Sequence, residues 1–114
     1  MGSHRTLKRR HLLFDLKVFD RTSRSLVGHM VDVTTRGMML VSESPLAVDR
    51  EYRFQLGLPP GLASTDSWDM TARSVWTGPD ANPALHGTGL KFVGFTRRDE
   101  QVLQDLIDNY ALND

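Results

Sequence analysis

The chain contains no cysteine, which excludes a disulfide framework and any metal site built on thiolates. This composition suits the reducing environment of the cytoplasm. No apolar run approaches the roughly 18 residues of a membrane-spanning helix, and no apolar segment follows the basic start of the chain, as a secretory signal would require. These absences favour a cytoplasmic protein with no membrane span.

An excess of either charge is also missing. The 14 basic and 14 acidic residues give a formal net charge of zero, which argues against a protein that wraps DNA or RNA. The charges are nevertheless separated along the chain. Near its start, a basic run consists of Arg5, Lys8, Arg9 and Arg10, and after Arg98 every charged residue is acidic. A short basic arm on a neutral body favours a small anionic ligand, but a solvated chain end has the same composition.

Sequence motifs for catalysis or metal binding are lacking too. The histidines (His4, His11, His29 and His86) are scattered without the spacing of metal ligands. There is no G-x-S-x-G nucleophile motif and no G-x-x-x-x-G-K-[ST] phosphate loop. We therefore predict a protein that is not an enzyme and has no metal or cofactor.

What the chain does contain is the length and pattern of one small domain. Its 114 residues are 39% hydrophobic, enough for one core. Residues 1–4 resemble the remnant of a purification tag, and residues 5–15 are expected to form a flexible basic arm. Short strands are predicted at 16–19, 26–34, 37–41, 51–58, 68–76 and 87–95, separated by turn residues. In two of them the alternation is clear, with Tyr52, Phe54, Leu56 and Leu58, and then Trp68, Met70, Ala72, Ser74 and Trp76, each on one face.

The end of the chain changes to helical spacing. Thr96 is a good N-cap, and Asp99 three residues later completes a capping-box pattern. We expect a helix at about 96–111 that lies against an antiparallel barrel, since closure removes exposed sheet edges. Its apolar stripe consists of Val102, Leu103, Leu106, Ile107 and Tyr110.

Two short motifs offer chemistry that suits a guanine nucleotide. The first is an R-x-x-x-R formed by Arg5 and Arg9, whose guanidinium groups can bind phosphate or the O6/N7 edge of guanine. The second is D-x-T-x-x-G, from Asp32 to Gly37, at the turn between the second and third strands. The Asp32 carboxylate can accept from guanine N–H groups and Thr34 offers a hydroxyl. Gly37 permits a positive φ and a close backbone approach.

Each motif alone also has an ordinary explanation. Among eleven arginines, one pair at this spacing is about what chance provides, and Asp and Gly form many strand connections. The combination is more specific, because Arg5 and Arg9 are the only such pair and directly precede the barrel. The second motif then follows the second strand.

This order resembles the PilZ family over nearly the whole chain, including Gly89-Leu90-Lys91-Phe92 in the last strand and the C-terminal helix. The stretch from Arg9 to Val33 looks like a stand-alone, single-domain branch. The resemblance implies an all-β fold with one C-terminal helix, a six-stranded antiparallel PilZ-type barrel. It also implies binding of the bacterial second messenger cyclic di-GMP on the outside of the barrel, often as a stacked dimer.

By match to the family motifs, Arg5 and Arg9 would clamp phosphates and guanine edges, Asp32 and Thr34 would read a guanine, and Gly37 would allow close approach. Thr34 stands where serine is more usual, so its methyl group could crowd the ligand. Arg10 is an extra cation beside the first motif. An aromatic residue at the position of Trp76 can lie close to the ligand in family members, although packing explains it as well. The full set of expected ligand-binding residues is Arg5, Arg9, Arg10, Asp32, Thr34, Gly37 and Trp76.

Three functions remain open on the sequence. In the first, cyclic di-GMP orders the basic arm and thereby changes the surface shown to an unidentified protein partner. In the second, the chain is a PilZ-like interaction module that no longer binds nucleotide. The third, a small barrel that binds single-stranded nucleic acid, is disfavoured by the zero net charge and the few exposed pairs of basic and aromatic residues.

Overall fold

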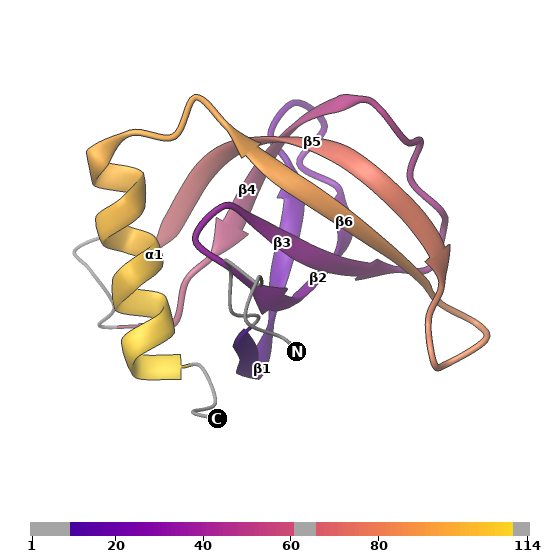
Figure 1. Cartoon of the computed structure of the whole chain (residues 1–114), viewed down its shortest axis with the longest axis horizontal. Coiled ribbons are helices and arrows are strands. Elements are labelled where there is room, and N and C mark those ends of the chain that lie inside the picture. The colour runs from indigo at the N-terminus through magenta and orange to yellow at the C-terminus, as the bar shows by residue number, and fades with distance from the viewer. Residues whose placement is uncertain (1–9, 61–65, 111–114) are drawn as a thin grey trace, which may run out of the picture.

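The computed structural model describes residues 10–60 and 66–110, except for the side chains of residues 10, 11, 13 and 14. Six antiparallel strands close into a barrel in the order β1-β2-β3-β6-β5-β4, and one helix lies beside it (Figure 1). The predicted six-stranded antiparallel barrel with a C-terminal helix is therefore confirmed. The elements are β1 Arg10–Asp20, β2 Leu26–Val33, β3 Gly37–Ser42, β4 Glu51–Gly57, β5 Ser67–Pro79, β6 His86–Val93 and α1 Arg97–Tyr110.

The first strand is longer than the sequence predicted. It begins at Arg10 instead of Leu16, so residues 10–15 of the expected arm belong to the barrel. Between the pairs His11↔Asp32 and Leu16↔Met30, β1 advances by five residues while β2 advances by two. This irregularity breaks the alternation with period two, which is why the start of the strand was missed. Arg5 and Arg9 lie outside the described residues.

The alternation predicted for β4 and β5 is confirmed except at its last member. Phe54 and Leu56 are fully buried, and Trp68 is 4% exposed. Trp76 was expected on the same face, but that prediction is wrong. β5 pairs Ser74 with Leu90 and Trp76 with Gly89, so two residues of β5 face one of β6. This bulge turns Trp76 to the outside of the barrel, where 43% of it is exposed.

The helix is anchored to the barrel at its first turn. The Thr96 amide donates to the Asp99 carboxylate (2.9 Å), and the Asp99 amide donates to the Thr96 hydroxyl (3.1 Å), which confirms the predicted capping box. The indole N–H of Trp68 in β5 donates to the same carboxylate at 2.8 Å. Val102, Leu103 and Leu106 are the buried residues of α1, and α1 contacts β1 and β5.

These contacts change the acidity of Asp99. Partial burial raises the pKa of its carboxyl, but the Thr96 amide, the Trp68 indole, the Thr96 hydroxyl and the nearby Arg98 charge oppose this effect. The net result is a pKa below the ordinary value, because these groups stabilise the carboxylate more than burial penalises it.

Among the described residues, no helix is long and apolar enough to cross a membrane.

Candidate functional site

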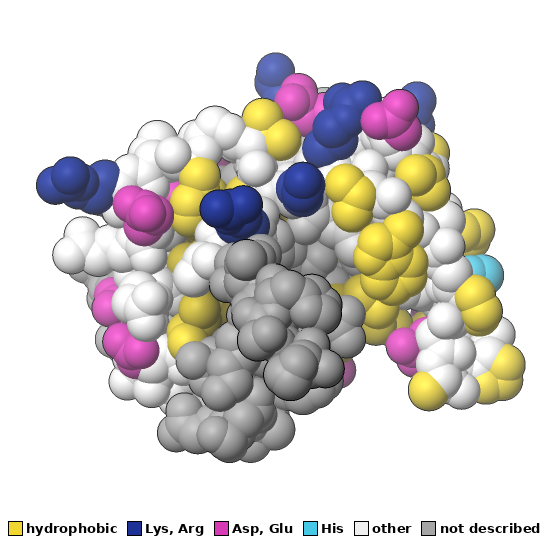
Figure 2. Space-filling view, in the orientation of Figure 1, with side chains coloured by type: hydrophobic (Ala, Val, Ile, Leu, Met, Phe, Trp, Pro, Cys, Tyr) yellow, Lys and Arg dark blue, Asp and Glu magenta, His cyan; other side chains and the backbone are white. Residues whose placement is uncertain are grey.

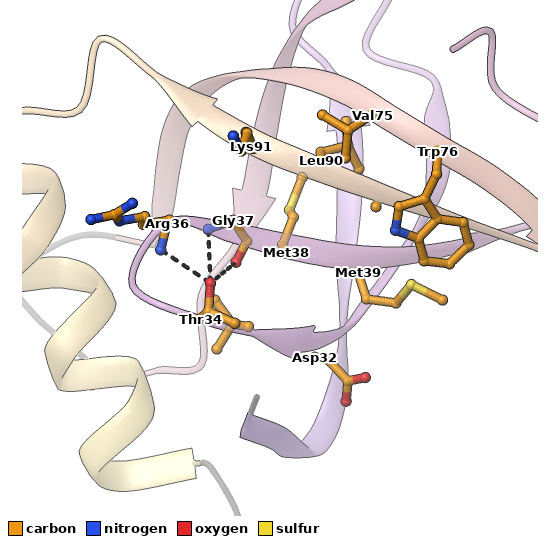
Figure 3. Close-up of a pocket in the computed structure, with 12 residues that line it drawn as sticks. Asp32, Thr34, Arg36, Gly37, Met38, Met39, Val75, Trp76, Leu90 and Lys91 are labelled. Carbon is orange, nitrogen blue, oxygen red and sulfur yellow. Dashed lines mark hydrogen bonds between the residues drawn. The ribbon is translucent and has the colours of Figure 1, made fainter. Parts of the chain in front are cut away.

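The turn between β2 and β3 is fixed by Thr34. Its amide donates to the Gly37 carbonyl at 2.8 Å, and its hydroxyl accepts from the amides of Arg36 and Gly37, both at 3.1 Å (Figure 3). The hydroxyl therefore holds the turn as well as lining the site. Serine could make the same bonds, which explains in physical terms why either hydroxyl residue suits this position.

Gly37 is required by the barrel itself. Gly37 does not use the positive φ that glycine permits, because Gly94 is the only positive-φ glycine in the described ranges. Gly37 is instead the first residue of β3 and pairs with Lys91 of β6. A Cβ at Gly37 would overlap the carbonyl oxygen of Leu90. The close approach that the sequence predicted is thus an approach between two strands.

Trp76 lies flat over a stretch of β6 that has no side chains. A Cβ at Gly89 would overlap the indole nitrogen of Trp76, and a Cβ at Gly87 would lie 2.6 Å from the Met39 methyl group. The two glycines thus leave room for the indole to cover the strand. Val75 and Trp76 are 47% and 43% exposed. In the space-filling view, hydrophobic side chains gather on the right of the viewed face and basic side chains lie beside them (Figure 2).

Asp32 lies on β2, opposite Met39 of β3 and His11 of β1. It is 6% exposed, an unusual environment for a carboxylate on the outer wall of a small barrel. Figure 3 shows its carboxylate on the β2 side of the group of residues that includes Trp76. Four predicted site residues, Asp32, Thr34, Gly37 and Trp76, line one hollow of about 340 Å³ with Arg36 and Lys91.

The structure does not place every predicted residue at this hollow. Arg5 and Arg9 lie outside the described residues, and Arg10, whose side chain is not described, pairs through its backbone with Val33. Sequence reasoning in turn missed Arg36 and Lys91 as members of the site. Arg36 occupies a variable position of the D-x-T-x-x-G motif, and Lys91 belongs to a strand pattern, so neither position suggested a contact with ligand.

Aromatic, acidic and basic side chains meet at the hollow. An exposed indole, a carboxylate and two cations line it. In residues 10–60 and 66–110, no three His, Asp or Glu side chains gather as metal ligands would. The arrangement offers a stacking surface, an acceptor for N–H groups and positive charge for an anion.

The chain matches the sequence model of the PilZ domain over residues 4–109. A search of curated proteins gives no match. Among solved structures, the PilZ domain of YcgR from Escherichia coli with c-di-GMP superposes with a TM-score of 0.71 at 12% identity, covering 92% of this chain and 89% of the other. The inhibitor of motility MotI/DgrA from Bacillus subtilis gives 0.70 at 18% identity over 92% of this chain.

A second YcgR structure, in complex with c-di-GMP, also gives a TM-score of 0.71 at 12% identity over 92% of this chain. The chain spans 50% of the MotI/DgrA chain and 45% of this YcgR chain. At these identities the superpositions show a shared fold.

Proposed function

The chain belongs to the PilZ domain family, and from that membership we propose that it binds cyclic di-GMP in the hollow beside Trp76. PilZ domains are non-catalytic receptors for this messenger. The proposed receptor passes the signal to a protein partner when the ligand orders the basic arm.

The exposed indole of Trp76 is the observation that carries this proposal. Exposing the apolar face of a large aromatic side chain to water is unfavourable, and a purine base that stacks on the ring would remove that face from water. Stacking of one base on an aromatic ring contributes about 1–3 kcal/mol. The glycines beneath the indole hold it flat, so its outer face is available to a planar ligand.

Asp32 supplies the selectivity in this proposal. A carboxylate accepts two hydrogen bonds, which matches the adjacent N1–H and N2–H donors of guanine. Adenine has no edge with two adjacent donors of this kind. The hollow of about 340 Å³ lies at the lower end of small-molecule sites, about 300–1,000 Å³. It would hold one guanine and its sugar, and we expect the rest of the ligand to be bound by Arg5, Arg9 and Arg10.

A second candidate is the interaction module that no longer binds nucleotide. It is favoured by one observation: Thr34 and Gly37 both have complete structural roles within the barrel. These two motif residues would therefore persist in a barrel that had lost its ligand. The exposed Trp76 is not explained in this way, which is why receptor function is preferred.

Isothermal titration with cyclic di-GMP tests the proposal. The protein with its native N-terminus is expected to bind with a Kd in the micromolar range or tighter, and Arg9→Ala and Asp32→Asn are expected to lose most of that affinity. Circular dichroism should show all three proteins folded. If the unsubstituted protein gives no heat of binding at about 100 µM ligand, its binding free energy is weaker than about 5.5 kcal/mol. That result would favour the interaction module instead.

A further inference from the structure

We propose that Arg36 and Lys91 form a phosphate-binding pair at the end of the hollow opposite Trp76, a role that neither sequence motif assigns. The inference rests on the proposed function, because it concerns the same site. Figure 3 places Arg36 and Trp76 at opposite ends of the lining residues, with Lys91 on β6 between the β5 and β3 sides. A ligand whose base covers Trp76 would therefore extend toward the two cations.

The backbone fixes the two cations relative to each other. The Arg36 amide donates to the Thr34 hydroxyl, and its carbonyl accepts from the Phe92 amide at 2.8 Å. Gly37, the next residue, pairs directly with Lys91. Arg36 directly precedes β3 and is one position removed from the Gly37–Lys91 pair. Both cations line the same hollow, so one anion bound there could contact both.

Neither cation has an acidic partner within the described part of the chain. The ion pairs found there are Arg21 with Asp69 at 4.0 Å and Arg73 with Asp49 at 2.8 Å. Arg36 and Lys91 are both exposed and take part in neither of them. Positive charge at this edge of the barrel is therefore available to a ligand.

The neighbour of Lys91 on the other side increases this excess. Arg73 of β5 lies directly opposite Lys91, and like charges in that relation destabilise a sheet. Arg73 donates to the Asp49 carboxylate through two nitrogens, at 3.1 and 2.8 Å, so its own charge is compensated. Lys91 has no such compensation, and a bound phosphate would provide it.

There is also room for a phosphate at the pair. Arg36 and Lys91 line a second hollow of about 270 Å³ with Thr35, Phe92 and Phe95. The two exposed cations therefore border both hollows, and a phosphate in either hollow would lie beside them.

Titration of the full chain with cyclic di-GMP at low and high salt, about 50 and 300 mM NaCl, tests the pair, since screening weakens exposed phosphate contacts. Arg36→Gln and Lys91→Gln are each expected to weaken binding about three- to fivefold, as for an exposed charge pair. The double variant should lose more and show a smaller salt dependence. Arg53→Gln removes an exposed arginine from β4 and is the control, expected to bind within about twofold of the unsubstituted protein.

The outcomes separate the pair from the site as a whole. Binding by the unsubstituted protein together with unchanged affinity and salt dependence in the double variant would overturn the pair and leave the proposed function standing. A loss of affinity with an unchanged salt dependence would also overturn it, because that pattern indicates a structural effect.

If the unsubstituted protein does not bind the nucleotide at all, the proposed function fails and inorganic pyrophosphate tests the pair alone. Amide shifts at Gly37 and Lys91 that disappear in the double variant would support the pair as a phosphate site. The absence of such shifts in the unsubstituted protein would overturn it.

Discussion

Two neighbouring regions of the outer barrel surface carry cations in opposite circumstances. Where β1, β4 and β5 meet, Arg21 donates to Thr71 at 3.1 Å and lies 4.0 Å from Asp69, which also accepts from Gln55. At the hollow between the β2–β3 turn, β5 and β6, Arg36 and Lys91 lie beside an exposed indole and take part in no ion pair within the described ranges. In the first region an arginine lies near an acidic residue of the chain, and in the second neither cation takes part in the ion pairs of the described ranges.

The difference teaches how to separate structural polar residues from binding residues in a small barrel. Both regions contain arginine, a carboxylate and threonine, so residue types alone do not distinguish them. What distinguishes them is whether the basic side chains lie in an ion pair with an acidic residue of the described chain.

The largest expected effect is the loss of stability when Gly37 is replaced, compared with replacement of Gly89 on the adjacent strand. Gly37→Ala forces a Cβ against the Leu90 backbone carbonyl, which cannot move without separating β3 from β6. We expect the free energy of unfolding to fall by about 2–4 kcal/mol, measured by urea denaturation.

Gly89→Ala is the matched variant. Its Cβ meets the ring of Trp76, which lies at the surface and can swing away, so stability should fall by only about 1 kcal/mol or less. Affinity for cyclic di-GMP should fall about tenfold because the stacking surface is displaced. Equal destabilisation by both substitutions would contradict the assignment of Gly37 to the fold and Gly89 to the site.

The two tryptophans provide the next comparison. Trp68→Phe removes the indole N–H that donates to Asp99 at 2.8 Å and leaves a gap in the core, so unfolding free energy should fall by about 1–3 kcal/mol. Trp76→Phe changes an exposed ring and should alter stability by about 0.5 kcal/mol or less. Thermal unfolding followed by circular dichroism measures both, and a reversed order would contradict the contrast between core and site.

Asp99 makes stability depend on acid pH. Because its pKa is lowered in the folded state, the carboxylate contributes stability that is complete above the ordinary aspartate pKa of about 3.9. That contribution is lost as the pH falls through the lowered pKa. Asp99→Asn should therefore be less stable than the unsubstituted protein at neutral pH, and the difference should shrink below about pH 4. A difference that is constant between pH 7 and pH 3 would contradict this explanation.

The smallest expected effect concerns the exposed pair of Arg73 and Asp49. Asp49 has a side-chain exposure of 82%, and such surface pairs contribute about 0–1 kcal/mol. Asp49→Asn should therefore change urea unfolding by less than about 1 kcal/mol. It should also convert Arg73 into an uncompensated cation beside Lys91, so binding of inorganic pyrophosphate should strengthen. Unchanged binding would show that the compensation of Arg73 does not matter to the site.

The sequence predicted the parts of the structure that depend on local pattern. Alternation placed β4 and most of β5, and the Thr96–Asp99 capping box placed the start of α1, because both signals arise within a few residues. The two failures, at the start of β1 and at Trp76, both occur at strand irregularities. An extra residue in a strand reverses which face each side chain occupies, and single-strand alternation contains no sign of it.

The site was predicted only in part for a related reason. The motif indicated Asp32, Thr34 and Gly37 because they are close in sequence. Lys91 joins them through the pairing of β3 with β6, a contact between distant segments that local pattern does not reveal. The close approach at Gly37 was predicted, but its partner was not, because Leu90 lies on that same distant strand.

The most direct test of the central claim is a fluorescence titration with cyclic di-GMP. The chain has only two tryptophans, so Trp76→Phe leaves the buried Trp68 as the sole fluorophore. We predict saturable quenching in the unsubstituted protein and none in Trp76→Phe, because a stacked base would lie on Trp76. Equal quenching in both proteins, or none in either, would contradict a ligand site at Trp76.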